Sequence, residues 1–325
     1  MRRRVLFALG AGTLIAPFGS FAQQRGKLWR IGFLGSESAF GFASRVEAFR
    51  EGLRDLGYEE GKNLTIEFRW ADGKNDRLPE LAAELVRLNV DVLVTYASPA
   101  IRAAKQATTV IPIVMAAVAD PVALGLIDSL ARPGGNVTGS TFFMTELAAK
   151  RIQLLKDAFP RIKQVAVLFD PGNSANAPAF KAMETVVRSA KLLLREFAVR
   201  GPDEFSSAFA SMVKEQIDAV VVMENPIFIT NGKAIAQLAA KERIVSVGQK
   251  EFAEAGGLIG YGANLLDLYR RAAYFVDRIL RGAKPADLPV EQPTKFDLVV
   301  NVKTARALGL KIPQSILLRA EKVIE

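Results

Sequence analysis

The sequence predicts an α/β protein with two similar lobes, each built on a doubly wound parallel sheet. Three observations support this prediction. Short apolar segments alternate with amphipathic segments of helical periodicity along most of the chain. The alternation starts again after Pro160, and one segment of the second half repeats residue types of the first half at the same spacing. Strands that alternate with helices of ten or more residues form parallel sheets with helices on both faces.

The first half of the chain provides four predicted strands and three predicted helices. Helix 42–56 carries an apolar stripe and ends before a glycine, and helix 76–88 repeats leucine on one face. A third helix begins at Pro99, because proline fits the first turn of a helix. The strands are short apolar or alternating segments at residues 29–34, 63–70, 91–97 and 111–117.

The second half repeats this order. Residues 164–170 form an apolar strand, residues 176–191 a helix and residues 192–199 a further strand. Segment 218–227 then matches segment 91–100, since in both an Asp opens a Val-rich strand and a helix-capping type of residue precedes Pro seven residues later. Such turns are common in α/β proteins, so chance is an alternative explanation. The match falls at the third strand of each half, where a duplicated architecture would place it.

Several crossings between the lobes are predicted. The chain leaves the first lobe near residues 139–144, returns to it near Gly262 and crosses again near Pro293. The predicted units are a leader over residues 1–22, a first lobe over residues 27–141 plus 262–292, and a second lobe over residues 142–261 plus 293–325. Repeated connections of this kind predict a hinge with a cleft between the lobes.

The composition excludes several classes of chemistry. The chain of 325 residues contains no Cys and no His. Disulfides, thiol nucleophiles, the commonest general base and the usual zinc or haem ligands are therefore excluded. The phosphate-loop pattern is absent, so we expect no metal and no organic cofactor. The alternative function is a secreted hydrolase that uses Ser, Lys or carboxylates, although the sequence lacks a G-x-S-x-G motif.

The first 22 residues have the features of a secretory signal peptide. Three arginines precede an apolar stretch that is interrupted by Gly10, Gly12 and Pro17, and small residues allow cleavage after Ala22. The adjacent arginines also fit the twin-arginine export route. A membrane anchor is the alternative, but it requires about 20 apolar residues without such breaks. We therefore expect a periplasmic protein that is not embedded in the membrane.

The positive charge of the chain is spread out. The formal net charge is +9, and without Arg2, Arg3 and Arg4 it falls to +6. No dense basic block with interleaved aromatic residues is present. Nucleic-acid binding would need such a patch. We therefore expect a solvated basic surface and no nucleic-acid partner.

Ligand contacts are expected where the predicted strands end. In an open parallel sheet, ligands bind beyond the carboxyl ends of the strands, where loops and helix N-termini meet. The residues that follow the strands and those in the crossing segments offer hydroxyl, amide, carboxylate and aromatic groups. The ten candidate ligand-binding residues are Ser36, Ser98, Asp120, Thr141, Phe142, Asn173, Glu224, Asn225, Tyr261 and Asn264. This set suits a small polar ligand with an apolar part.

Most of these candidates also have a structural interpretation. Ser98 can hold a ligand carboxylate with the adjacent helix amides, or it can be the N-cap of the helix. Glu224 and Asp120 can face a ligand ammonium, or they can serve as turn or helix-dipole residues. Asn173 lies in a turn signal, and Asn264 fits a helix cap. The two aromatic candidates are of a type found more often in cores than as stacking platforms.

Four runs of the sequence resemble one protein family. They are residues 48–94, residues 130–139 (LARPGGNVTG), residues 251–264 (EFAEAGGLIGYGAN) and residues 267–301. These runs are similar to the ABC transporter substrate-binding proteins that include bacterial tryptophan and tyrosine binders. The resemblance extends over nearly the whole chain after the leader. It implies a type I periplasmic-binding-protein fold with three hinge crossings and a ligand enclosed between the lobes.

The resemblance also implies a function. A protein of this family captures a small organic ligand without catalysis and delivers it to the membrane permease of an ABC-type importer. The Ser98 turn corresponds to a hydroxyl-bearing turn that helps to hold the ligand. Amino acids and aromatic carboxylates are both candidate ligands. We expect the protein to be a monomer.

Overall fold

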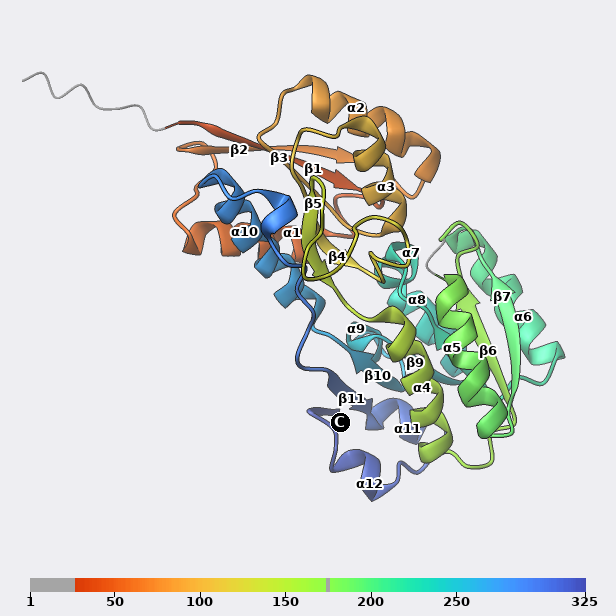
Figure 1. Ribbon diagram of the computed structural model, residues 1–325. Helices are drawn as coiled ribbons and strands as arrows, with labels where there is room; N and C mark the ends of the chain where they lie inside the picture. Colours follow the sequence, from red (N-terminus) through yellow and green to blue (C-terminus); the bar gives the residue numbers. More distant parts are fainter. Residues whose placement is uncertain (1–26, 174–175) are drawn as a thin grey trace, which may run out of the picture.

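The computed structural model describes residues 27–173 and 176–325 of the chain (Figure 1). These residues form two α/β lobes, each with a central sheet covered by helices, as the sequence predicts. The predicted leader, residues 1–22, lies outside the described residues. Within the described ranges, no helix has both the length and the apolar character that crossing a bilayer requires.

The first lobe contains a parallel sheet with the strand order β2-β1-β3-β4-β5. Its strands are β1 (Trp29–Gly35), β2 (Leu64–Trp70), β3 (Val92–Thr95), β4 (Ile113–Val118) and β5 (Val137–Thr141). Its helices are α1 (Ala43–Asp55), η1 (Asn75–Arg77), α2 (Leu78–Arg87), α3 (Ser98–Ala107), α10 (Leu265–Leu280) and η3 (Pro285–Asp287). Strands β3 and β4 are buried along their whole length, which is why they consist of continuous apolar runs.

The second lobe contains a seven-stranded sheet with the order β12-β11-β10-β9-β8-β6-β7. Its strands are β6 (Gln164–Phe169), β7 (Leu193–Ala198), β8 (Ala219–Val222), β9 (Val245–Gly248), β10 (Ile259–Gly262), β11 (Asp297–Asn301) and β12 (Lys322–Ile324). Its helices are α4 (Met144–Ala158), α5 (Asn176–Ser189), η2 (Pro202–Glu204), α6 (Phe205–Lys214), α7 (Pro226–Thr230), α8 (Gly232–Lys241), α9 (Lys250–Glu254), α11 (Val302–Ala307) and α12 (Gln314–Leu317).

One strand pair differs from the predicted parallel arrangement. Strand β11 runs antiparallel to β10, with Gly262 opposite Asp297. The path of the chain explains this reversal. The chain leaves the second lobe at the carboxyl end of β10 and re-enters it beside the same end, so the next strand must run in the opposite direction.

The two sheets share one strand order. In each lobe the first strand lies between the second and the third, because β1 pairs with β2 and β3 while β6 pairs with β7 and β8. The order therefore reverses between β1 and β3 and between β6 and β8. Such switch points separate the loops that follow the two strands and create a crevice where ligands bind.

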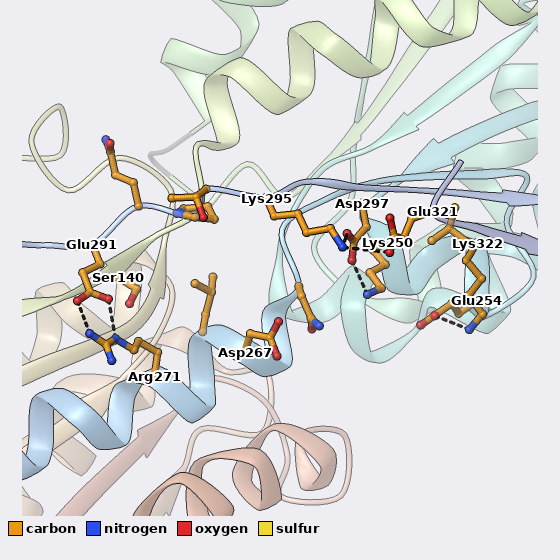
Figure 2. A pocket seen from close by; sticks show the side chains of 16 residues that line it. Ser140, Lys250, Glu254, Asp267, Arg271, Glu291, Lys295, Asp297, Glu321 and Lys322 are labelled. Atoms are coloured by element: carbon orange, nitrogen blue, oxygen red, sulfur yellow. Dashed lines mark hydrogen bonds and ion pairs between the residues drawn. The ribbon is translucent and has the colours of Figure 1, made fainter. Parts of the chain in front are cut away.

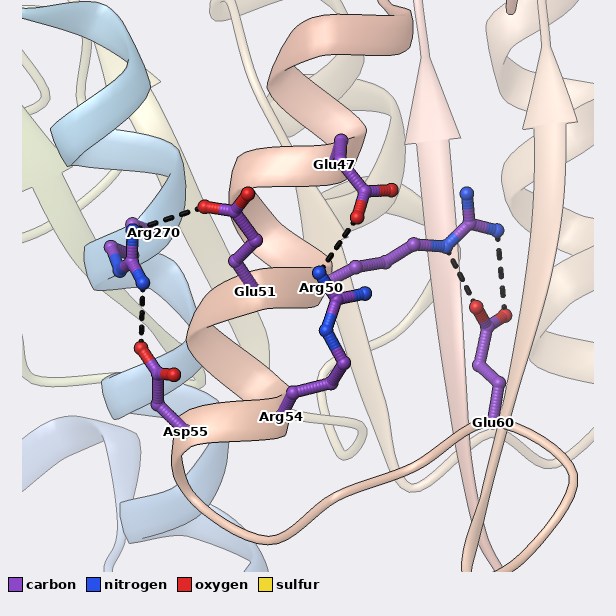
Figure 3. A network of polar contacts seen from close by, with 7 residues as sticks. All are labelled: Glu47, Arg50, Glu51, Arg54, Asp55, Glu60 and Arg270. Carbon is purple, nitrogen blue, oxygen red and sulfur yellow. Dashed lines mark hydrogen bonds and ion pairs between the residues drawn. The ribbon is translucent and has the colours of Figure 1, made fainter.

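Helix α10 packs along α1 on the first lobe. Gly52 allows a close approach, since a Cβ atom at this position would lie 2.5 Å from the backbone oxygen of Arg270. The Arg270 guanidinium bonds to Glu51 at 3.0 Å and to Asp55 at 2.7 Å (Figure 3). Exposed ion pairs of this kind contribute about 0–1 kcal/mol each. The association of the two helices therefore depends mainly on their buried apolar faces.

Three connections join the lobes. They are residues 142–143 between β5 and α4, residues 263–264 between β10 and α10, and residues 288–296 between η3 and β11. The first and third connections lie side by side, because the Thr141 amide donates a hydrogen bond to the Glu291 carbonyl at 2.9 Å. Segments that are far apart in the sequence thus form one waist between the lobes (Figure 1).

The contact at Gly52 predicts that Gly52→Ala destabilises the protein. Alanine favours a helix by about 1 kcal/mol over glycine, but its methyl group would collide with the backbone of α10. We expect a net loss of about 1–3 kcal/mol in the free energy of unfolding, the usual cost of overpacking. Denaturant titration measures this loss. Gly135→Ala is the control, because nothing lies within 4 Å of a Cβ atom there. Equal stability of both variants would contradict the role of Gly52.

Candidate functional site

Two adjoining cavities lie between the lobes. The first, which we call the aromatic cavity, has a volume of about 40 Å³. Residues of both lobes line it, among them Phe42, Tyr96, Ser98, Phe142 and Tyr269 from the first lobe and its connection and Asn173, Glu224, Asn225 and Ile229 from the second. The second, which we call the polar cavity, has a volume of about 200 Å³ and shares Ala97, Asn225 and Pro226 with the first.

Three aromatic rings form one wall of the aromatic cavity. The Phe42 and Tyr96 rings are stacked with centroids 4.3 Å apart, and the Tyr269 ring meets them edge-on at 6.3 Å and 5.8 Å. The three residues come from the start of α1, the end of β3 and the middle of α10. Burial raises the pKa of Tyr96 and of Tyr269, so both remain neutral phenols. This wall suits an aromatic or apolar group.

The Ser98 turn differs from the prediction in one respect. Ala97, not Ser98, occupies the N-cap position of α3, and its side chain makes no capping hydrogen bond. Ser98 is instead the first residue of the helix. The Ala97 backbone has a φ of 58°, a conformation that costs a residue with a Cβ atom about 1–3 kcal/mol and that is found most often at functional sites. The wall of the cavity is thus formed by a strained turn and the N-terminal end of a helix.

The repeated turn of the second lobe lies opposite the Ser98 turn. Asn225 caps α7, as predicted, because its Oδ1 accepts a hydrogen bond from the Ile227 amide at 3.0 Å. Its Nδ2 donates to Asp170 at 3.0 Å, which fixes the loop that follows β6. The two turns with matching sequences therefore line the same cavities from opposite lobes.

Glu224 presents a carboxylate at the lobe 2 wall. Only 5% of the residue is exposed, and its Oε1 accepts a hydrogen bond from Nη2 of Arg151. Among the described residues, no group forms a hydrogen bond with its Oε2. Arg151 is fully buried and also donates from Nε and Nη2 to the Tyr261 carbonyl, at 2.9 Å and 2.5 Å. One carboxylate oxygen is therefore held by the protein and the other can accept from a ligand.

Two acidic residues from opposite lobes line the polar cavity. Glu37 follows β1 and Asp170 follows β6. Burial, the Asp170 carboxylate and the Asp72 carboxylate together raise the pKa of Glu37 from 4.5 to about 7. Arg200 and the buried hydroxyl of Ser36 also line this cavity. The polar cavity therefore holds a carboxyl group that titrates near neutral pH.

The remaining candidates take structural positions. The Asp120 carboxylate accepts from the Ala123 amide at 3.0 Å, so it serves as a turn residue. The Thr141 hydroxyl bonds to the carbonyls that end β4, and the Tyr261 ring lies beside Phe296. Asn264 caps α10, as its alternative interpretation predicts. Thr141, Tyr261 and Asn264 thus belong to the waist.

Sequence reasoning missed the aromatic wall, Glu37 and Arg151. Tyr96 stands two residues before Ser98, and that proximity is a usable signal. Phe42 lies on an apolar helical stripe, where nothing distinguishes it from a core residue. Arg151 lies on an amphipathic helix next to Lys150, and the sequence gives no sign that only one of these two charges is buried.

A third cavity lies on the hinge side of the waist and has a volume of about 720 Å³ (Figure 2). An ion pair of 2.6 Å joins Arg271 to Glu291 on its lobe 1 side, and one of 2.7 Å joins Lys250 to Asp297 on its lobe 2 side. The first pair ties Glu291 of the third connection to lobe 1, and the second lies at the start of β11 in lobe 2. Lys295, which lies between them in the sequence, also pairs with Asp297 at 3.5 Å and with Glu321 at 3.0 Å on lobe 2.

The described parts of the chain contain no group of three or more His, Cys, Asp or Glu side chains that could hold a metal ion.

Comparisons with known proteins agree with this architecture. A tyrosine-binding protein from Clostridioides difficile is 26% identical over 266 residues, which are 82% of this chain and 76% of the relative. A conserved domain protein from Vibrio cholerae has a TM-score of 0.85 and 27% identity, covering 91% of this chain and 100% of that chain. A Streptococcus pneumoniae protein in complex with L-Trp has a TM-score of 0.84 and 27% identity, covering 91% and 99%.

These similarities confirm the predicted fold, which is that of type I periplasmic binding proteins. The family model described as ABC transporter substrate binding protein matches residues 38–324. The match covers the second lobe, all three connections and the first lobe from the residues after β1 onward. The chain therefore belongs to the family of ABC transporter substrate-binding proteins.

Proposed function

We propose that the protein binds an aromatic amino acid between its lobes and delivers it unchanged to the permease of an ABC-type importer. The observation that carries this proposal is the Glu224 carboxylate. It is buried, it has one oxygen with no partner among the described residues, and it lines the same cavity as three aromatic rings. A ligand with an ammonium group and an aromatic ring satisfies both features, whereas an aromatic carboxylate would leave the Glu224 oxygen unpaired.

The ligand carboxylate is proposed to bind at the Ser98 turn. Ser98 lies at the N-terminal end of α3, where the helix dipole and unpaired amides favour an anion. Its hydroxyl can donate a further hydrogen bond. The carboxylate and the ammonium of the ligand would then be held by turns of opposite lobes. The tyrosine-binding relative and the L-Trp complex support this ligand class.

Closure of the lobes is proposed as the binding step. The aromatic cavity has room for only a few water molecules in the present arrangement, so a ligand needs the lobes to separate before it enters. The two lobes also approach each other closely at Gly41 and Thr230, as a closed form requires. A Cβ atom at Gly41 would lie 3.4 Å from the Thr230 Cβ on the other lobe. Ligand binding then shifts the population toward a closed form that the permease recognises.

The same proposal includes the cellular location of the protein. The leader over residues 1–22 would export the chain, and the mature protein would act in the periplasm as a monomer. Family membership supports this place, since such proteins supply a membrane transporter.

The ligand contacts predict two variants with weakened binding. We expect Glu224→Gln and Ser98→Ala each to bind L-tryptophan or L-tyrosine about 10–100 times more weakly, because a hydrogen bond to a charged ligand group is lost. Isothermal titration calorimetry measures the change, and Ser211→Ala on the exposed face of α6 is the control. Recovery of the ligand unaltered is expected. Binding equal to that of the control in both variants would contradict the proposed site, and turnover of the ligand would favour a hydrolase.

Closure predicts that the lobes can be locked. The chain has no Cys, so the double variant Gly41→Cys/Thr230→Cys contains one thiol pair, at a Cβ separation near that of natural disulfides. We expect ligand to accelerate oxidation, and we expect the oxidised form to exchange ligand far more slowly than the reduced form. Gel mobility and ligand dissociation rates test this, with Gly41→Cys alone as the control. If the oxidised double variant exchanged ligand at the wild-type rate, separation of the lobes would not be the step that admits the ligand.

The raised pKa of Glu37 predicts a pH-dependent stability. The protonated carboxyl is favoured in this arrangement, so the contribution of Glu37 is fully present below about pH 4.5 and is lost as pH rises through about 7. The loss is at most about 3 kcal/mol. We expect Glu37→Gln to flatten the fall in melting temperature between pH 5 and 8, while Glu196→Gln on exposed β7 leaves it unchanged. Parallel pH profiles for wild type and Glu37→Gln would exclude this role.

A further inference from the structure

Arg151 lies at a junction of three elements of the second lobe. Its side chain extends from α4 and is fully buried. Nη2 donates to Oε1 of Glu224, which follows β8, and both Nε and Nη2 donate to the carbonyl of Tyr261 in β10. One guanidinium group therefore joins the ligand-facing carboxylate to the strand that leads into the second connection.

The surroundings of Arg151 hold the guanidinium in one orientation. Gly262 leaves room for it, since a Cβ atom there would lie 3.2 Å from Nη2. A guanidinium is planar and its donors have fixed directions, so two bonds to the Tyr261 carbonyl and one to Glu224 define its plane. The Glu224 carboxylate is consequently fixed through Oε1, and Oε2 is the oxygen left for a ligand.

The pairing also offsets the charge of Glu224. Burial of an unpaired carboxylate is costly, and an adjacent guanidinium offsets that cost only when the geometry is good. Lys150, the neighbouring cation on α4, makes an exposed contact with Gln153 instead. Arg151 therefore does not line the aromatic cavity itself, but it lies directly behind Glu224, which does.

From these contacts we infer that Arg151 is a positioning residue that sets the selectivity of the site for ligands with an ammonium group, because it holds Glu224 with one oxygen bound and the other directed to the ligand. This inference rests on the proposed function. A residue that only stabilised the fold would change the affinity for all ligands alike. A positioning residue changes the affinity for the ammonium-bearing ligand relative to its deamino analogue.

The test compares L-tryptophan with indole-3-propionate, and L-tyrosine with 3-(4-hydroxyphenyl)propionate, by calorimetry on the mature protein. We expect wild type to prefer each amino acid by about 10–100-fold. Arg151→Lys keeps the positive charge but loses the planar guanidinium with its fixed donor directions. In this variant we expect the preference for the amino acid to fall to within about 3-fold of the preference shown by Glu224→Gln. The double variant Arg151→Lys/Glu224→Gln is expected to match Glu224→Gln, because Arg151 acts through Glu224. Arg188→Lys, exposed on α5, is the control.

Each outcome is decisive. A preference in Arg151→Lys that stays more than about 3-fold above that of Glu224→Gln overturns the positioning role while leaving the proposed function intact. Wild type that binds neither amino acid, or that binds the deamino acids equally well, overturns the proposed ligand class itself. If Arg151→Lys does not fold, Arg151→Gln/Glu224→Gln replaces it, since this pair leaves no unpaired buried charge. A preference that differs from that of Glu224→Gln by more than about 3-fold in this double variant again excludes the role.

Discussion

The arrangement of the site depends on one constraint, which is that all parallel strands of a sheet end at the same edge. Each lobe has the same strand order around its first strand, so each has a switch point at which the loops after two neighbouring strands separate. The loops from these two points line the aromatic and polar cavities from opposite sides. The Ser98 turn and the Asn225 turn are equivalent positions of the two lobes, and they meet because both lobes direct this edge toward the gap.

The aromatic cavity between the lobes has an apolar wall and a charged wall. Neutral phenols and a stacked phenylalanine form the apolar wall, and burial keeps those phenols protonated. In the aromatic cavity the charge lies in the opposite wall, where Arg151 pairs with one oxygen of Glu224, while the adjoining polar cavity has carboxyl groups on both sides. Because a buried charge is costly without a partner, this division is the physical basis of the proposed ligand class, in which the polar groups are at one end and the apolar ring is at the other.

The three connections that form the waist determine how the two lobes are joined. Helix α10 returns to the first lobe and is fixed against α1 at Gly52, whereas β11 belongs to the second lobe. The ion pairs around the third cavity tie Glu291 of the third connection to lobe 1 and Lys295 of the same connection to lobe 2. The proposed closure of the lobes would need backbone changes in only a few residues of each connection.

Local pattern was enough to predict much of this protein. The alternation of apolar runs with amphipathic helices determined the α/β class, the restart after Pro160 determined two lobes, and the repeated Asp-to-Pro spacing singled out the Ser98 and Asn225 turns. These features survive in a single sequence because strand, helix and cap preferences act over a few residues. The tertiary structure alone decided which residues meet. It reversed β11, placed Tyr261 at the waist and brought Phe42, Tyr96, Tyr269 and the Arg151–Glu224 pair to the cavities between the lobes. Contacts between residues that are distant in the sequence depend on how whole elements pack and leave no local pattern.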